Sequence, residues 1–278
     1  MPTALVLTLR PSAPATVAPY LGRAAHAAFL RALGARDQAF ARRLHDSGAL
    51  KPFATSDLLG ASRGPQGRMV APDRTYGMRW SAISPELDEC LRDWAATPPT
   101  EFDLDGTLFR VEAATIDPVA DSWAGTADWS ELIALEQVGR APPPAWFALH
   151  FVAPTTFRSN GRNIPLPLPE LVFGSLVERW NGSAPIPLPA DIRRFAAEHL
   201  VIGTYQLQSE RVAAFEGGET AFTGRCTYVP TNHDRYYLHC CAALLRLAFF
   251  SGVGAKTSMG FGAVRGEAAP RRGSGPQP

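Results

Sequence analysis

The chain has 278 residues, 46% of them hydrophobic and 19% charged, with a formal net charge of +1 at pH 7. That length allows one large domain or two of ordinary size. No stretch of about eighteen apolar residues occurs, so we expect no membrane-spanning helix, and the first residues lack the basic segment of a signal peptide. The spacing of the four cysteines fits neither a zinc site nor a disulfide framework, which favours a reducing cytoplasm.

Charge is unevenly distributed along the chain. Residues 1–80 carry 11 Lys/Arg against 4 Asp/Glu, residues 81–140 carry 3 against 13, and residues 141–278 carry 13 against 9. Because local charge governs phosphate binding, the near-neutral total is compatible with nucleic-acid binding by the two basic segments. Ordinary solvated surface can show the same asymmetry, so charge alone selects no function.

The first 114 residues alternate between strand and helix patterns. Apolar and β-branched runs predict strands at 4–10, 51–59, 75–83 and 108–113, and apolar residues at helical spacing predict helices at 20–33, 37–44 and 85–94. Residues 60–74 are rich in Gly, Pro and Arg and are expected to form a loop. The resulting order is β-α-β-β-α-β, the ferredoxin-like arrangement.

The same order recurs after a connector at 115–145, which is acidic at first and ends in three prolines. Strands are predicted at 146–152, 200–207, 221–229 and 261–265, helices at 170–180, 191–199 and 235–250, and an irregular proline-rich stretch at 154–169. The expected fold is α+β: two tandem ferredoxin-like (RRM-like) βαββαβ modules, 1–114 and 146–265, with a C-terminal glycine-rich loop. The tail at 266–278 is expected to be disordered.

The glycine-rich loop joins the last apolar helix to the final strand. Its glycines and its polar residues are Gly252, Gly254, Lys256, Thr257, Ser258, Gly260 and Gly262. Glycine lets successive backbone N–H groups face an anion, so a phosphate backbone is the expected guest. A nucleotide-binding P-loop is disfavoured, because Ala255 precedes the lysine and the loop follows a helix. The alternative is a turn that only lets two elements pack closely.

Three stretches together carry a family resemblance. The first spans 44–56 (LHDSGALKPFATS) and follows the helix at 22–30, the second is 76–80 (YGMRW), and the third is the glycine-rich loop. With these stretches, and with 154–158 (PTTFR) and the helix at 171–180, the chain resembles the repeat-RNA-processing endoribonucleases of CRISPR systems, the sixth family of CRISPR-associated (Cas) proteins. The glycine-rich loop is shared with non-catalytic CRISPR subunits, whereas the histidine–lysine stretch is more specific to the nuclease.

The resemblance implies two ferredoxin-like modules and metal-independent cleavage of precursor CRISPR RNA within each repeat, with no cofactor. The ribose 2′-OH attacks the adjacent phosphate and leaves a 2′,3′-cyclic phosphate and a 5′-OH. This chemistry needs a base, an acid and a cation near the phosphate. His45 and Lys51 stand where some members carry a catalytic histidine and lysine. Leu30 stands where those members carry a catalytic tyrosine, so His26 could take the second proton-transfer role instead.

Other basic residues are candidates for RNA phosphate contacts. They are Arg63, Arg68 and Arg74 in the Gly/Pro loop, Arg158, and His233 at the start of the last helix. Three further histidines, His150, His199 and His239, are interpreted as structural. At 76–80 we expect a core face with one exposed residue, Arg79.

Two function classes therefore stand side by side. One is the metal-independent endoribonuclease, and the other is a non-catalytic RNA-binding subunit of a CRISPR effector complex. Precursor CRISPR RNA is the expected partner, other effector subunits are further candidates, and either a monomer or a homodimer fits. A single-turnover cleavage assay separates the two classes.

Overall fold

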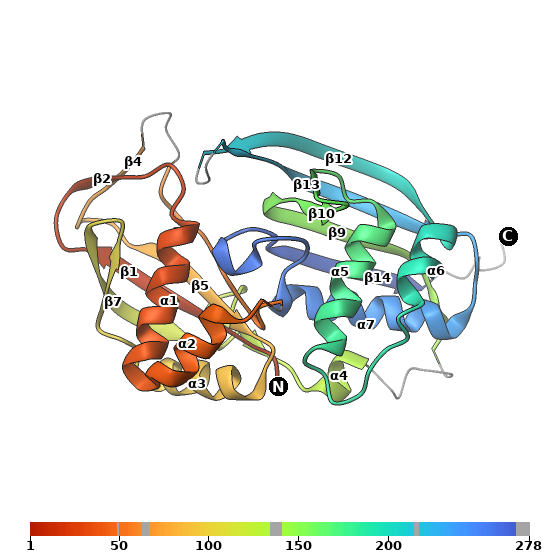
Figure 1. Ribbon diagram of the computed structural model, residues 1–278, viewed down its shortest axis with the longest axis horizontal. Helices are drawn as coiled ribbons and strands as arrows, with labels where there is room; N and C mark the ends of the chain where they lie inside the picture. Colours follow the sequence, from red (N-terminus) through yellow and green to blue (C-terminus); the bar gives the residue numbers. More distant parts are fainter. Residues whose placement is uncertain (49, 63–66, 134–140, 214–216, 271–278) are drawn as a thin grey trace, which may run out of the picture.

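The computed structural model describes residues 1–48, 50–62, 67–133, 141–213 and 217–270. Within these ranges the protein is α+β, with two lobes that each carry a twisted antiparallel sheet (Figure 1). In the described ranges, no helix is both long and apolar enough to cross a membrane.

The first lobe packs helices on one face of a sheet with the order β3-β5-β1-β7-β6. Its main elements are β1 Thr3–Pro11, α1 Gly22–Arg36, α2 Gln38–Asp46, β3 Phe53–Thr55, β5 Tyr76–Ala82, α3 Pro85–Ala96, β6 Glu101–Leu104 and β7 Thr107–Thr115. Alternate residues of the central strands point into the core, as in the facing pairs Leu5–Trp80 and Leu7–Met78, which are fully buried. This period of two is the pattern that predicted the strands.

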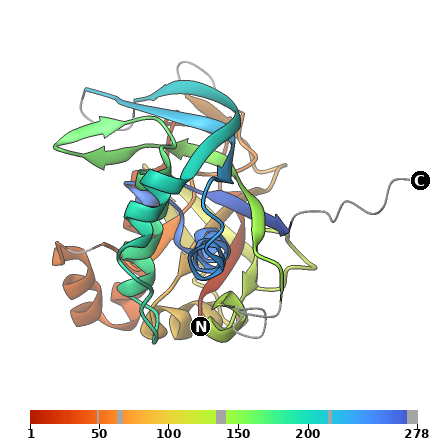
Figure 2. The ribbon, with the colours of Figure 1, turned by 90° about the vertical axis from the view of Figure 1, so that its right-hand side faces the viewer.

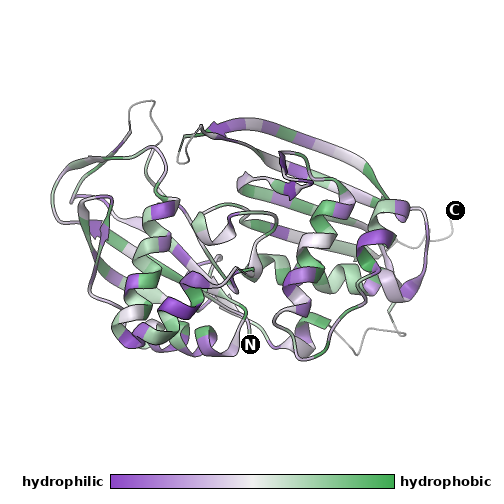
Figure 3. Ribbon diagram, viewed as in Figure 1, coloured by the Kyte–Doolittle hydropathy of each residue, from purple (hydrophilic) through white to green (hydrophobic). Residues whose placement is uncertain are grey.

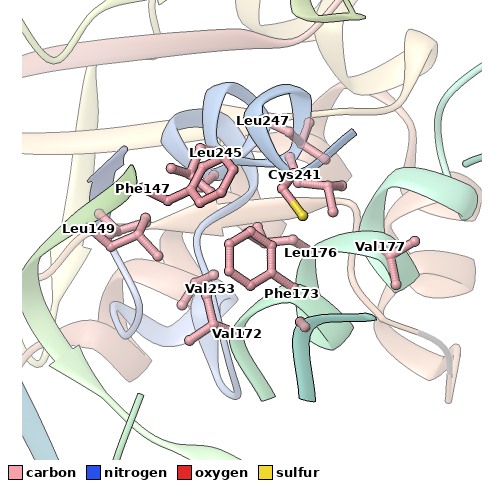
Figure 4. Close-up of a cluster of buried hydrophobic side chains, with 14 of the residues drawn as sticks. Phe147, Leu149, Val172, Phe173, Leu176, Val177, Cys241, Leu245, Leu247 and Val253 are labelled. Carbon is pink, nitrogen blue, oxygen red and sulfur yellow. The ribbon is translucent and has the colours of Figure 1, made fainter. Parts of the chain in front are cut away.

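The second lobe has a four-stranded sheet with the order β12-β13-β9-β14. Its elements are β9 Pro144–Thr155, α5 Pro169–Asn181, α6 Ile192–His199, β12 Leu200–Val212, β13 Glu219–Pro230, α7 Arg235–Ser251, the 3-10 helix η1 Thr257–Met259 and β14 Val264–Pro270. Figure 4 shows its core, where Phe147 and Leu149 of β9 meet Phe173 and Leu176 of α5 and Leu245 of α7. The two sheets share one strand order. If the four main strands of each lobe are numbered along the chain, without the edge strand β6, they lie across the sheet in the order second, third, first, fourth.

Several short elements lie where the sequence predicted loops. They are β2 Ala15–Val17 paired with β4 Arg68–Val70, β8 Gly125–Thr126 beside β1, α4 Trp129–Ile133, and the hairpin of β10 Phe157–Ser159 with β11 Arg162–Ile164. The expected connector therefore contains a strand and a helix, and the expected irregular stretch contains a hairpin. The last strand also runs to Pro270, so the predicted disordered tail begins too early, because β14 pairs along β9 as far as Pro144. Residues 271–278 lie outside the described residues.

Helix α7 joins the two lobes. It passes behind α5 in Figure 1 and is seen end-on near the centre of Figure 2. Its C-terminal carbonyls point into the first lobe, where Arg79 Nη2 donates to Phe249 O at 2.7 Å and Ser81 Oγ donates to Phe250 O at 2.6 Å. Arg79 was expected to be exposed but is only 6% exposed, and burial lowers its pKa to about 9. A buried cation at the negative end of a helix fixes the start of the glycine-rich loop.

Candidate active site

Helix α2 carries the first candidate, His45, in its last turn. The Asp37 side chain caps the start of the helix by accepting a hydrogen bond from Phe40 N at 2.8 Å. The His45 side chain is 66% exposed, and its Nδ1 lies 2.9 Å from Asp46 Oδ1. The outward face of α2 is hydrophilic (Figure 3). The carboxylate therefore orients an imidazole that stands open to a ligand.

Lys51 folds back over the end of α2. Its ammonium group donates to the carbonyl oxygens of Leu44, His45 and Ser47 at 2.5, 2.8 and 2.6 Å. An ammonium group has three N–H donors, so these three carbonyls engage all of them. Burial lowers the pKa of Lys51 below its ordinary value, and Asp46 partly offsets that effect. Lys51 thus caps the helix end that presents His45.

His26 projects from α1 towards the glycine-rich loop. Its Nδ1 lies 2.9 Å from Ser258 O, and its ring stacks on Phe53 with centroids 5.6 Å apart. A carbonyl oxygen can only accept, so Nδ1 carries the proton and the neutral ring has Nε2 as its acceptor. Burial lowers the pKa of His26, the Ser258 carbonyl raises it, and the charges of His45 and Lys51 lower it again. The three predicted catalytic residues therefore share one electrostatic environment.

The glycine-rich loop packs tightly against this site. Gly252, Gly254, Gly260 and Gly262 all have φ between 64° and 86°, and all four are buried. A Cβ at Gly262 would lie 2.1 Å from the backbone carbonyl oxygen of Val253, so only glycine fits there. The Ser258 carbonyl accepts from both Thr55 Oγ1 and His26, and the Thr257 and Ser258 side chains are buried. The loop is a joint between the lobes as well as a neighbour of His26.

Lys256 is not the solvated cation that its position in the loop suggested. Its ammonium group forms an ion pair with the carboxylate of Glu219, which is 5% exposed, while Lys256 itself is 27% exposed. Behind the loop, Arg179 is buried and its Nη2 donates to Gly254 O at 2.8 Å, and burial lowers its pKa to about 10. Nothing in the sequence pointed to Glu219 or Arg179, because each of them meets the loop only in the folded chain.

The remaining predicted RNA contacts have different surroundings. Arg68 is 2% exposed and forms a 2.7 Å ion pair with Asp57, so it is a core residue rather than a solvated loop arginine. Arg74 and Arg158 are exposed. His233 is also exposed, but it precedes the start of α7, about 25 Å along the helix from the glycine-rich loop. Arg63 lies outside the described residues.

Comparisons with known proteins give this geometry a family. The family model described as CRISPR-associated endoribonuclease Cas6 matches residues 149–264, and the CRISPR Cas6 N-terminal domain matches residues 1–74. A Cas6 product complex is 30% identical to this chain with a TM-score of 0.75, covering 96% of this chain and 99% of that one. This chain belongs to the Cas6 family. The resemblance stated from the sequence is thereby confirmed.

Two further relatives of this Cas6 chain extend the comparison. A product complex of Thermus thermophilus Cas6 is 28% identical with a TM-score of 0.78, covering 96% of this chain and 100% of that one. A curated Cas6 endoribonuclease of Mycobacterium tuberculosis is 32% identical over 140 residues, which is 49% of this chain and 44% of the relative. The match therefore spans less than half of that curated relative.

Proposed function

We propose that this protein cleaves precursor CRISPR RNA within its repeats, without a metal ion, by attack of the ribose 2′-OH. Membership of the Cas6 family and the product complexes of two relatives support this activity. The shared strand order of the two sheets supports tandem ferredoxin-like modules. The observation that carries the proposal is His26, whose Nδ1 is held by the Ser258 carbonyl in the field of His45 and Lys51.

His26 is suited to the role of general base. Because burial lowers its pKa, the ring is neutral near pH 7, and the bond from Nδ1–H to Ser258 O leaves Nε2 to accept a proton. In the proposed step, Nε2 takes the 2′-OH proton while the 2′-oxygen forms a bond to phosphorus. The bond from phosphorus to the 5′-oxygen then breaks, which yields the 2′,3′-cyclic phosphate.

His45 is suited to the role of general acid. Asp46 Oδ1, 2.9 Å from Nδ1, orients the exposed ring so that its other nitrogen can deliver a proton to the leaving 5′-oxygen. Lys51 fixes the backbone that carries His45 and places a positive charge near the phosphate. The exposed Arg74 and Arg158, together with the glycine-rich loop, are proposed to contact the RNA backbone.

A non-catalytic RNA-binding subunit of a CRISPR effector complex is the second candidate. One observation favours it: Leu30, which occupies the position expected for a catalytic tyrosine, packs against the core of the first lobe. In a non-catalytic subunit, His26 and His45 would only bind RNA and would transfer no proton.

A single-turnover assay with purified protein and repeat RNA separates the two candidates. The endoribonuclease should cut in EDTA and leave a 2′,3′-cyclic phosphate and a 5′-OH. A 2′-deoxy substitution at the nucleotide that supplies the attacking hydroxyl should abolish cleavage and preserve binding. Cleavage that requires magnesium would refute the metal-independent mechanism, and binding without any cleavage would favour the subunit.

A further inference from the structure

A pocket of about 160 Å³ adjoins the candidate active site. Its walls come from Leu50 in the first lobe, from α5, and from Gly254 and Ala255 in the glycine-rich loop. Leu50 directly precedes Lys51, and Ala255 directly precedes Lys256, so two chain segments connect the pocket to the site. An engineered cavity of about 150 Å³ holds a benzene ring, so a pocket of this size accepts a flat aromatic base.

Two arginines line this pocket, Arg158 and Arg193, and Arg193 is the one whose stem packs against a helix. Arg193 of α6 lies across α5 at Gly174, where an added Cβ would be 3.1 Å from Arg193 Cδ and 3.2 Å from Arg193 Cγ. Glycine inside a helix is destabilising relative to alanine, and here the missing side chain makes room for the arginine stem. Glu178 holds the other end, with its Oε1 3.8 Å from Arg193 Nη1. The guanidinium and its carboxylate partner thus stand side by side at the pocket.

The chemistry of the pocket matches one base better than the others. Apolar surface comes from Leu50, Leu171 and Phe157, and the charged lining is Arg158, Arg193, Glu170 and Glu178. Of these, Arg193 and Glu178 form an ion pair that offers a donor and an acceptor side by side. Guanine presents two adjacent acceptors, O6 and N7, which suit a guanidinium, and an N2 amino donor beside N1–H, which suits a carboxylate. Adenine places a donor beside its N7 acceptor, and therefore opposes the arginine.

We propose that this pocket binds the guanine of an unpaired nucleotide next to the scissile phosphate, with Arg193 on O6 and N7 and Glu178 on N1–H and the N2 amine. Unpaired bases are commonly splayed out of RNA and read on these two edges. This inference rests on the proposed endoribonuclease activity and names a determinant of its substrate preference.

The test uses single-turnover cleavage of the repeat RNA from the protein's own CRISPR locus. At each nucleotide flanking the cut, guanine is compared with 7-deazaguanine, which lacks N7, with inosine, which lacks the N2 amine, and with adenine. For the wild type, adenine at the bound position should raise the half-saturating protein concentration by about tenfold or more. Arg193→Ala should remove the sensitivity to 7-deazaguanine, and Glu178→Gln should remove the sensitivity to inosine.

Arg194→Ala is the matched control, because Arg194 is the next residue of α6, pairs with Asp191 at 3.5 Å and does not line the pocket. In all these variants the rate at saturating protein should stay within about threefold of the wild type. The proposal is overturned if the wild type tolerates every base at both flanking positions, or if Arg193→Ala behaves like Arg194→Ala. In either case, cleavage by the wild type would still support the proposed endoribonuclease activity. A wild type that never cleaves would refute both the activity and the guanine pocket.

Discussion

Replacing His26 by asparagine separates the catalytic role of this residue from its structural one. The asparagine Nδ2 lies where the histidine Nδ1 lies, so it can still donate to Ser258 O, but it offers no basic nitrogen. If His26 is the general base, His26→Asn should lower the single-turnover cleavage rate by about 10²–10⁴-fold, as should His26→Ala.

The structure limits how much of that loss can come from unfolding. His26→Ala removes one hydrogen bond, worth about 1 kcal/mol, and a ring contact with Phe53, worth about 0.5–1.5 kcal/mol. Thr55 still satisfies the Ser258 carbonyl, so no acceptor is left buried without a partner. The free energy of unfolding should therefore fall by about 2 kcal/mol, which is a small part of the usual 5–15 kcal/mol.

The assay pairs cleavage of labelled repeat RNA at saturating protein with thermal unfolding of each variant. His26→Asn should melt closer to the wild type than His26→Ala, while both variants lose cleavage alike. If the cleavage rate of His26→Asn is within about threefold of the wild-type rate, His26 only contacts the loop and is not the general base. The role of general base would then be assigned to His45.

Three other changes test neighbouring parts of the site. His45→Ala should slow bound-state cleavage by about 10²–10⁴-fold with little change in melting temperature, because the side chain is 66% exposed; an unchanged rate would exclude it as the acid. The acid limb of the profile of kcat/KM against pH should lie below 6.5, because burial lowers the pKa of His26 and a base loses activity as it becomes protonated; a limb above 6.5 would contradict this role. Glu219→Gln and Lys256→Ala should each lower the free energy of unfolding by about 1–3 kcal/mol in urea titrations, less than for a fully buried pair because Lys256 is 27% exposed; stability equal to the wild type would show that the pair is not structural.

Two hairpins contain turn sequences that predict a hairpin and that the sequence analysis did not draw on. Asp105-Gly106 joins β6 to β7, and Asn160-Gly161 joins β10 to β11. In both turns the two central residues have positive φ, at 58° and 81° and at 50° and 74°. Asp-Gly and Asn-Gly favour this type I′ geometry, which matches the twist of a two-stranded hairpin. Strand β7 was predicted at 108–113 from its own pattern, and the two turns made β6, β10 and β11 predictable as well, although short strands next to prolines give a weak hydrophobic pattern.

The longer helices and the candidate catalytic residues could be predicted from the sequence, the helices from hydrophobic periodicity and the residues from the family resemblance. Hydrophobic periodicity reports which face of a segment is buried, and it predicted all six of the longer helices to within a few residues. The family resemblance selected His45, Lys51 and His26, and the fold brings these three residues into one electrostatic environment. Their roles in cleavage stay predictions.

The sequence by itself determined the order of the longer strands and helices, and it pointed to the family and to the glycine-rich loop, because each of these depends on patterns within short stretches of the chain. Only the tertiary structure decided what the loop touches. Ser258 meets His26 across 232 residues, and Lys256 meets Glu219 across 37. Periodicity contains no information about such partners, because the first pair depends on how the two lobes dock and the second on how β13 and the loop meet within the second lobe. Docking of the lobes sets a loop carbonyl against the histidine proposed as the base, and packing within the second lobe pairs the cation of the loop with a buried carboxylate.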